Sequence, residues 1–140
     1  MAFWDASAVV PLCCSQVATV QGRRLQRELK RMIVWWGTPL ETRSAFARLV
    51  REGGLTEAER GGAIRLLGRL RLAWDEILPT EKLRALAEDL PDAHVLRAAD
   101  AAQLAAALVW CGERPRKRPF VCFDERLRVA AHELGFSVRP

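Results

Sequence analysis

Short apolar runs alternate with helix signals along this chain, and this alternation most limits the folds that it can adopt. Two runs contain no charged residue: residues 32–36 (Met-Ile-Val-Trp-Trp), which end at Gly37, and residues 120–123 (Phe-Val-Cys-Phe), which end at Asp124. Strands without a polar face are buried on both sides, as in a parallel sheet covered by helices. The sequence therefore predicts an α/β fold with a central, mostly parallel sheet flanked by helices.

Turn and cap residues place the other elements of this fold. Further strands are expected at residues 2–4, 72–78 and 136–139, and helices at residues 6–12, 15–30, 38–52, 56–70, 80–90, 96–110 and 125–134. In the helix over 15–30 we expect the apolar residues Val17, Val20, Leu25 and Leu29 to face inward, with a basic outer face. Thr38 and Glu41 have the spacing of a capping box, with Thr38 as the N-cap.

Length and composition exclude several classes of protein. A chain of 140 residues is one domain by length, and no apolar stretch reaches the roughly 18 residues that a membrane span needs. The start of the chain lacks the basic segment of a signal peptide, so we expect a cytoplasmic protein with buried, reduced thiols. No Cys or His spacing suggests zinc. The net charge of +5, with 19 Arg and 3 Lys, favours an anionic partner, although an Arg-rich composition can also reflect a GC-rich genome.

Four acidic residues stand next to predicted element ends. Each has a purely structural explanation: Asp5 as a turn residue, Glu41 as a capping-box acid, Asp100 as a first-turn acid and Asp124 as an N-cap. However, strand ends and following helix starts lie on the same edge of a parallel sheet, so all four should gather at one rim. Clustered carboxylates repel one another and need a positive charge between them. All-oxygen ligands favour Mg²⁺ or Mn²⁺ over zinc.

The stretches around these acids resemble the PIN-domain ribonucleases, in particular the VapC-type toxins of bacterial toxin-antitoxin pairs. The similarity spans nearly the whole chain, through residues 3–7, 39–41, 96–101 with 104–108, and 123–127 with 133–136. It implies a single PIN-like domain over residues 1–140 with about five parallel strands. It also implies a Mg²⁺- or Mn²⁺-dependent endoribonuclease whose catalytic and metal-binding residues are Asp5, Glu41, Asp100 and Asp124. A homodimer and inhibition by a small cognate antitoxin are further implications.

Three positions qualify this resemblance. Ser7 matches the family's small polar residue and is expected either to bind a phosphate or metal-bound water, or to cap the segment after the first strand. Cys122 stands where many relatives have Thr or Ser. Gln103 stands where relatives often have an aromatic or His side chain, and we expect it to affect packing without contacting the acids.

Substrate and partner contacts can also be proposed from the sequence. The basic loop near residues 114–118 contains Arg116, Lys117 and Arg118, which we expect to contact RNA unless the loop is merely solvated. An antitoxin would insert a basic side chain among the four acids and bind an apolar groove around Leu25, Leu29, Phe46 and Leu49, unless these side chains belong to the ordinary core.

Other classes of protein match less well. A haloacid-dehalogenase-type phosphotransferase needs a second Asp two residues after the first, where this chain has Ser7, and a receiver domain needs a paired acid beside the first Asp. A catalytically silent PIN-like module that binds nucleic acid or protein remains the alternative. The presence of all four acids favours the enzyme.

Overall fold

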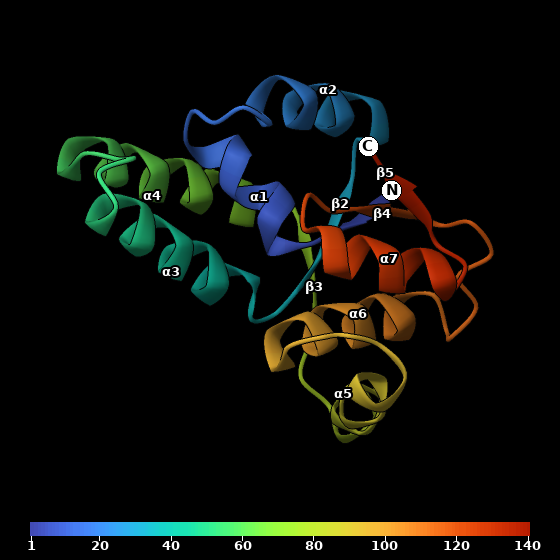
Figure 1. Ribbon diagram of the computed structural model, residues 1–140. Coiled ribbons are helices and arrows are strands. Elements are labelled where there is room, and N and C mark those ends of the chain that lie inside the picture. The colour runs from blue at the N-terminus through green and yellow to red at the C-terminus, as the bar shows by residue number, and fades with distance from the viewer.

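Five parallel strands form the centre of the computed structural model, which describes all 140 residues (Figure 1). The strands are β1 (Ala2–Trp4), β2 (Met32–Trp35), β3 (Asp75–Ile77), β4 (Pro119–Val121) and β5 (Ser137–Arg139), and their order in the sheet is β3-β2-β1-β4-β5. The central strand is the first in the chain, and its Phe3 pairs with Ile33 on one side and Phe120 on the other. The predicted α/β fold with a parallel sheet is confirmed.

Seven helices cover the sheet in two groups. They are α1 (Ala6–Cys13), α2 (Thr19–Leu29), α3 (Thr38–Arg51), α4 (Glu57–Arg71), α5 (Glu81–Ala93), α6 (Ala98–Trp110) and α7 (Glu125–Glu133). The first four pack on one face and the last three on the other (Figure 1). No helix is both long enough and apolar enough to span a membrane.

Each face of the sheet has its own hydrophobic core, and the strands alternate between them. Phe3, Ile33 and Phe120 belong to the core under α5, α6 and α7, whereas Trp4 and Val34 belong to the core under α1, α3 and α4. Successive side chains of a strand point to opposite faces, so strands between two cores have no polar position. This is the physical reason for the uninterrupted apolar runs in the sequence.

The segment before α2 departs from the predicted helix over 15–30. Val17 and Val20 are 105% and 81% exposed, so the prediction that they face inward is wrong. Thr19 explains the difference, because its hydroxyl accepts a hydrogen bond from Gln16 N (2.8 Å) and donates one to Cys14 O (3.1 Å). These bonds hold a turn, and the helix begins only at Thr19.

The apolar groove expected for an antitoxin is not an open surface. Leu25 and Phe46 are buried in the core between the sheet and the first four helices, and Leu29 and Leu49 pack against that core. These side chains stabilise the fold, and a partner could reach them only after the helices had separated.

Candidate acidic site

The carboxyl-end edge of the sheet carries the four acids singled out in the sequence. Asp5 follows β1, Asp124 follows β4 after two residues, and Glu41 and Asp100 lie in the first turns of α3 and α6. All four line one open hollow of about 300 Å³, which we call the acidic hollow. No three of these or any other His, Cys, Asp or Glu side chains already converge in the geometry of a metal site.

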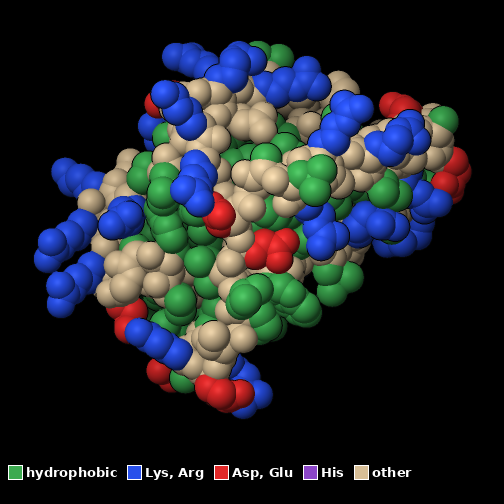
Figure 2. Space-filling model, turned by 180° about the vertical axis from the view of Figure 1, so that it is seen from behind, with side chains coloured by type: hydrophobic (Ala, Val, Ile, Leu, Met, Phe, Trp, Pro, Cys, Tyr) green, Lys and Arg blue, Asp and Glu red, His purple; other side chains and the backbone are tan.

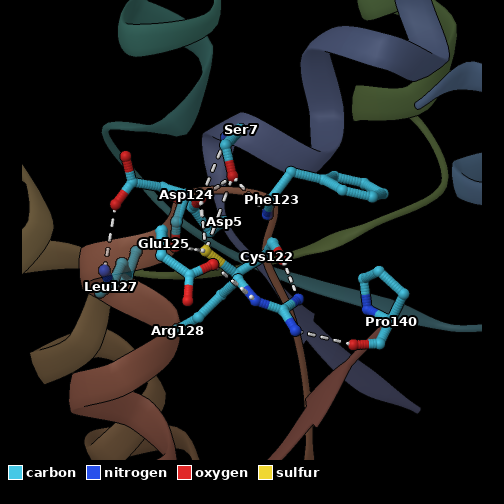
Figure 3. A network of polar contacts seen from close by, with 9 residues as sticks. All are labelled: Asp5, Ser7, Cys122, Phe123, Asp124, Glu125, Leu127, Arg128 and Pro140. Carbon is cyan, nitrogen blue, oxygen red and sulfur yellow. Dashed lines mark hydrogen bonds and ion pairs between the residues drawn. The ribbon is translucent and has the colours of Figure 1, made fainter. Parts of the chain in front are cut away.

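Asp5 is held by donors that all reach the same carboxylate oxygen (Figure 3). Its Oδ2 accepts hydrogen bonds from the backbone N of Ser7 (3.1 Å), from the Ser7 hydroxyl and from the Cys122 thiol (3.3 Å). Its Oδ1 accepts none. Burial raises the pKa of Asp5 above its usual range, although the donors from Ser7 and Cys122 oppose this shift.

Ser7 connects the ends of two strands at this point. Its Oγ donates to Asp5 and accepts a hydrogen bond from Phe123 N (2.9 Å), so the hydroxyl joins the start of α1 to the end of β4 (Figure 3). Arg128 of α7 steadies the same turn by donating to Cys122 O (3.0 Å). Ser7 therefore positions Asp5, and Cys122 provides a weak donor where a hydroxyl was expected.

Glu41 does not form the predicted capping box. The N-cap of α3 is Gly37, Thr38 is the first helical residue, and no side chain caps the helix. The reason lies in Gln103 of α6, whose Nε2 donates to both Thr38 Oγ1 (3.1 Å) and Glu41 Oε1 (3.1 Å). The expectation that Gln103 avoids the acids is therefore also wrong, and the long-range contact releases Glu41 from a capping role.

The environment of Glu41 strongly disfavours its charged form. Burial and, to a smaller extent, the charges of Asp5 and Asp100 raise the pKa of Glu41 to about 8, although the Gln103 hydrogen bond opposes this shift. The carboxyl group therefore binds a proton near neutral pH unless a positive charge compensates for its surroundings.

Asp100 and Asp124 each have the structural role expected of a single acid. Asp100 Oδ2 accepts a hydrogen bond from Arg97 N (3.2 Å) at the start of α6, and Asp124 Oδ1 accepts one from Leu127 N (3.0 Å) at the start of α7. In both cases only one oxygen is used. The cap roles are real, and they leave the second oxygen of each carboxylate available.

The four carboxylates thus share two properties. Each uses one oxygen within the protein and keeps the other free of any protein hydrogen bond. None forms an ion pair, since every salt bridge of the chain involves other acids. The acidic hollow therefore holds four carboxylates, none of which forms an ion pair.

One basic side chain that lines the acidic hollow was missed in the sequence. Arg48 stands seven residues after Glu41 on α3, which is two helical turns and places both on the same side of the helix. It is exposed and forms no ion pair. The seven-residue spacing could have identified it.

The basic loop lies elsewhere. Residues 112–118 precede β4 and so lie at the amino-end edge of the sheet, opposite the acids. There Lys117 N donates to Gly135 O (2.9 Å), and the Arg118 guanidinium lies 5.3 Å from the centre of the Trp110 ring. The structure does not bring Arg116, Lys117 or Arg118 together with the acidic hollow.

The donor chemistry of the acidic hollow fits a hard divalent cation. Four free carboxylate oxygens, with no His or Met among the lining residues, are the ligands that Mg²⁺ and Mn²⁺ prefer. A further acceptor is buried close by, because Gln103 Oε1 has no hydrogen-bond partner. Such a cation would stabilise the charged form of Glu41, which burial and the charges of Asp5 and Asp100 disfavour.

A comparison with protein-family models finds no match for the chain, and neither does a comparison with curated proteins. Function is therefore argued from the chemistry and geometry of the acidic hollow.

Proposed function

We propose that this chain is a Mg²⁺- or Mn²⁺-dependent endoribonuclease that acts as the toxin of a toxin-antitoxin pair. The observation that carries the proposal is a hollow lined by four carboxylates, each with a free oxygen and none with a basic partner. Two carboxylates about 4 Å apart repel by roughly 4 kcal/mol at an effective dielectric constant of 20. Carboxylates that share a hollow and form no ion pair raise one another's pKa, as Asp5 and Asp100 do for Glu41, and a bound cation would relieve this.

Asp5, Asp100 and Asp124 would hold the cation, and Glu41 would assist them or help to hold a second ion. When bound, the cation supplies Lewis acidity, which lowers the pKa of water and offsets negative charge on a phosphate. Ser7 and Cys122 fix the orientation of Asp5 by occupying its Oδ2, so that Oδ1 faces a ligand. Gln103 does the same for Glu41 through Oε1.

Glu41 also suits proton transfer. Its pKa of about 8 in the protein alone lies near neutral pH, where a general acid or base is most effective, and a cation nearby would lower it. Arg48 would contact the RNA backbone beside the acids, since an arginine without an ion-pair partner is free to bind phosphate. The net charge of +5 attracts RNA over longer distances.

The biological part of the proposal follows the resemblance to VapC-type toxins. It comprises a cytoplasmic homodimer and a cognate antitoxin that inserts an Arg or Lys among the four acids. A guanidinium can satisfy two carboxylates through paired hydrogen bonds, so this residue would compete with the metal ion. With Leu25 and Phe46 buried, the antitoxin would have to bind at the rim of the acidic hollow.

The decisive experiment is cleavage of single-stranded RNA by the wild-type protein, Asp5→Asn and Asp89→Asn, with Mn²⁺ and with EDTA. Asp5→Asn keeps the capping acceptor but removes a charge, and we expect its activity to fall more than about a hundredfold, as does wild-type activity in EDTA. Asp89 is an exposed acid on α5, outside the acidic hollow, and is the matched control. RNA binding without cleavage under all conditions would instead favour the catalytically silent module.

A further inference from the structure

A large aromatic side chain is exposed next to the acidic hollow. Trp36 is 54% exposed, the other four tryptophans are buried or half-buried, and Trp36 follows β2, which is the strand beside β1 and Asp5. Neighbouring strands lie about 4.8 Å apart, so the two positions are close along the rim of the sheet. Leu40 and Leu78, also exposed, belong to the same edge.

Trp36 is held in place although it is exposed. Its backbone N donates to Ile77 O (3.0 Å), and its ring meets that of Trp35 edge to face, with the ring centres 6.3 Å apart and the planes at 67°. Trp36, Leu40 and Leu78 are exposed at the same edge, and apolar side chains that gather on a surface often mark a binding site. An indole that is already ordered also loses little entropy when a ligand stacks on it.

A second hollow adjoins the tryptophan pair. It has a volume of about 480 Å³. Its apolar lining includes Trp35, Leu83, Ala87 and Ala102, and its two charged residues, Glu81 and Arg84, pair with each other. Apolar walls with a few polar groups are usual in sites for ring-shaped ligands. Ala102 precedes Gln103, which binds Glu41, so this hollow and the acidic hollow flank the same turns of α6.

The surrounding charge favours a nucleic acid as the ligand. Arg48 of α3 lines the acidic hollow and forms no ion pair. Figure 2 shows acidic side chains near the middle of one face, with basic side chains and an apolar area around them. An aromatic platform near an arginine that is free to bind phosphate is a combination by which proteins bind single-stranded RNA, with bases stacked and phosphates paired.

We propose that Trp36 and the hollow walled by Trp35 form a nucleobase-binding subsite for single-stranded RNA beside the acidic hollow. The inference rests on the proposed nuclease function, and it adds that the substrate enters unpaired, with a base on Trp36 while its phosphates lie along Arg48 and the acids. The ring of Trp36 provides a stacking face for any base, so the subsite favours single strands without selecting a sequence.

The test measures the binding of a short oligoadenylate to the protein in EDTA. EDTA removes divalent cations, so metal-dependent cleavage does not degrade the oligonucleotide during the measurement. Loss of one stacked base weakens binding by about 5- to 150-fold, which is the change expected for Trp36→Ala. Trp36→Phe retains a ring and should bind nearly as well as wild type while losing the quenching of Trp36 fluorescence by RNA. Trp110→Ala is the matched control, because Trp110 lies at the other end of α6.

Abasic nucleotides identify stacking as the cause. An oligonucleotide with abasic positions should bind wild type more weakly than oligoadenylate, and Trp36→Ala should bind both equally. Equal binding of the two oligonucleotides by wild type would overturn the subsite. The subsite would also be overturned if Trp36→Ala changed the sedimentation coefficient of the protein but left its RNA binding unchanged. Trp36 would then lie in a contact between protein chains.

The same protein samples separate this inference from the proposed function. Metal-dependent RNA cleavage that Asp5→Asn abolishes, together with oligoadenylate binding that Trp36→Ala leaves intact, would retain the nuclease and refute the subsite. Trp36-dependent binding without any metal-dependent cleavage would retain the subsite and refute the nuclease.

Discussion

Residues of like charge gather at both edges of the sheet, but they differ in sign and in their exposure to solvent. At the amino-end edge, Arg114, Arg116, Lys117 and Arg118 are exposed on a loop in which Gly112, Glu113, Arg116 and Lys117 have positive φ values. At the carboxyl-end edge, four acids line one hollow; Asp5 is buried and the others are half-buried. Water and salt screen the exposed charges, whereas the four carboxylates are partly withdrawn from solvent and form no ion pair.

This difference shows that burial, more than the number of charges, marks the candidate site. The basic loop is the more conspicuous feature of the sequence, yet its side chains are solvated or, as with Arg118, lie over an aromatic ring. The acids are dispersed in the sequence, and their pKa values respond to one another: the charge of Asp5 raises the pKa of Glu41, and that of Asp100 raises the pKa of both. A ligand that restores charge balance gains most at the carboxyl-end edge.

The sharpest way to break this comparison is Glu41→Gln, which keeps the shape of the side chain and its acceptor for Gln103. We expect the variant to fold and to cleave RNA more than about a hundredfold more slowly, because its negative charge is required beside the cation. Cleavage is measured with Mn²⁺ at neutral pH. Normal cleavage by this variant would mean that Glu41 is no part of the site.

The same substitution should alter how stability depends on pH. The pKa of Glu41 is raised from 4.5 in the unfolded chain to about 8 in the fold, so the folded protein retains a proton that the unfolded chain releases. The free energy of unfolding of the metal-free protein should therefore fall as pH rises from about 4.5 to about 8, by up to about 1.4 kcal/mol per pH unit. Urea denaturation across this window should show a smaller slope for Glu41→Gln, and an unchanged slope would contradict the assignment.

Gln103→Leu tests whether the buried amide positions Glu41. The substitution removes the donor to Glu41 Oε1, and outer-shell changes of this kind reduce metal affinity by about 10- to 100-fold. Thr38→Val is the control, since it removes the other partner of Gln103 and leaves the bond to Glu41 in place. Equal loss of Mn²⁺ affinity in both variants would indicate a packing effect instead.

The smallest expected effect compares basic residues at the two edges. Arg48→Ala should weaken RNA binding and reduce the slope of log affinity against log salt concentration by about 0.7, the change for one phosphate contact with a single strand. A combined Arg116→Ala and Lys117→Ala variant should leave this slope unchanged, because the loop lies at the opposite edge. A salt slope that changes in the Arg116→Ala and Lys117→Ala variant but not in Arg48→Ala would instead place the bound RNA at the amino-end edge.

Local patterns predicted the elements of the fold better than the contacts of the site. The apolar strands at Met32–Trp35 and Pro119–Val121 could be predicted because burial on both faces leaves its mark on consecutive residues. The helix predicted from residue 56 begins with a capping box, in which Thr56 and Glu59 bond reciprocally as their three-residue spacing allows. The similar pattern at Thr38 failed because Gln103, 65 residues away in the chain, takes the Thr38 hydroxyl as its acceptor.

The gathering of the acids could be predicted from topology, since parallel strands end at one edge. The hydrogen-bond partners of the acids could not be predicted in this way. Contacts between α1, α3, α6 and the end of β4 determine which oxygen of Asp5 accepts hydrogen bonds. They also determine that Glu41 binds Gln103 instead of capping its helix. Arg48 could have been found, since its spacing of seven residues from Glu41 places it on the same side of α3.

The central claim is that the four carboxylates form a cation site, and the most direct test is the effect of Mn²⁺ on unfolding. At a Mn²⁺ concentration of 100 times its Kd, we expect wild type to gain about 2.7 kcal/mol of unfolding free energy. Asp5→Asn, Glu41→Gln, Asp100→Asn and Asp124→Asn should lose most of this gain. Without metal, Asp5→Asn should be at least as stable as wild type, because the burial that raises the pKa of Asp5 no longer opposes a charge. An equal Mn²⁺ effect in all five proteins, or an Asp5→Asn variant that is less stable without metal, would show that the carboxylates serve the fold alone.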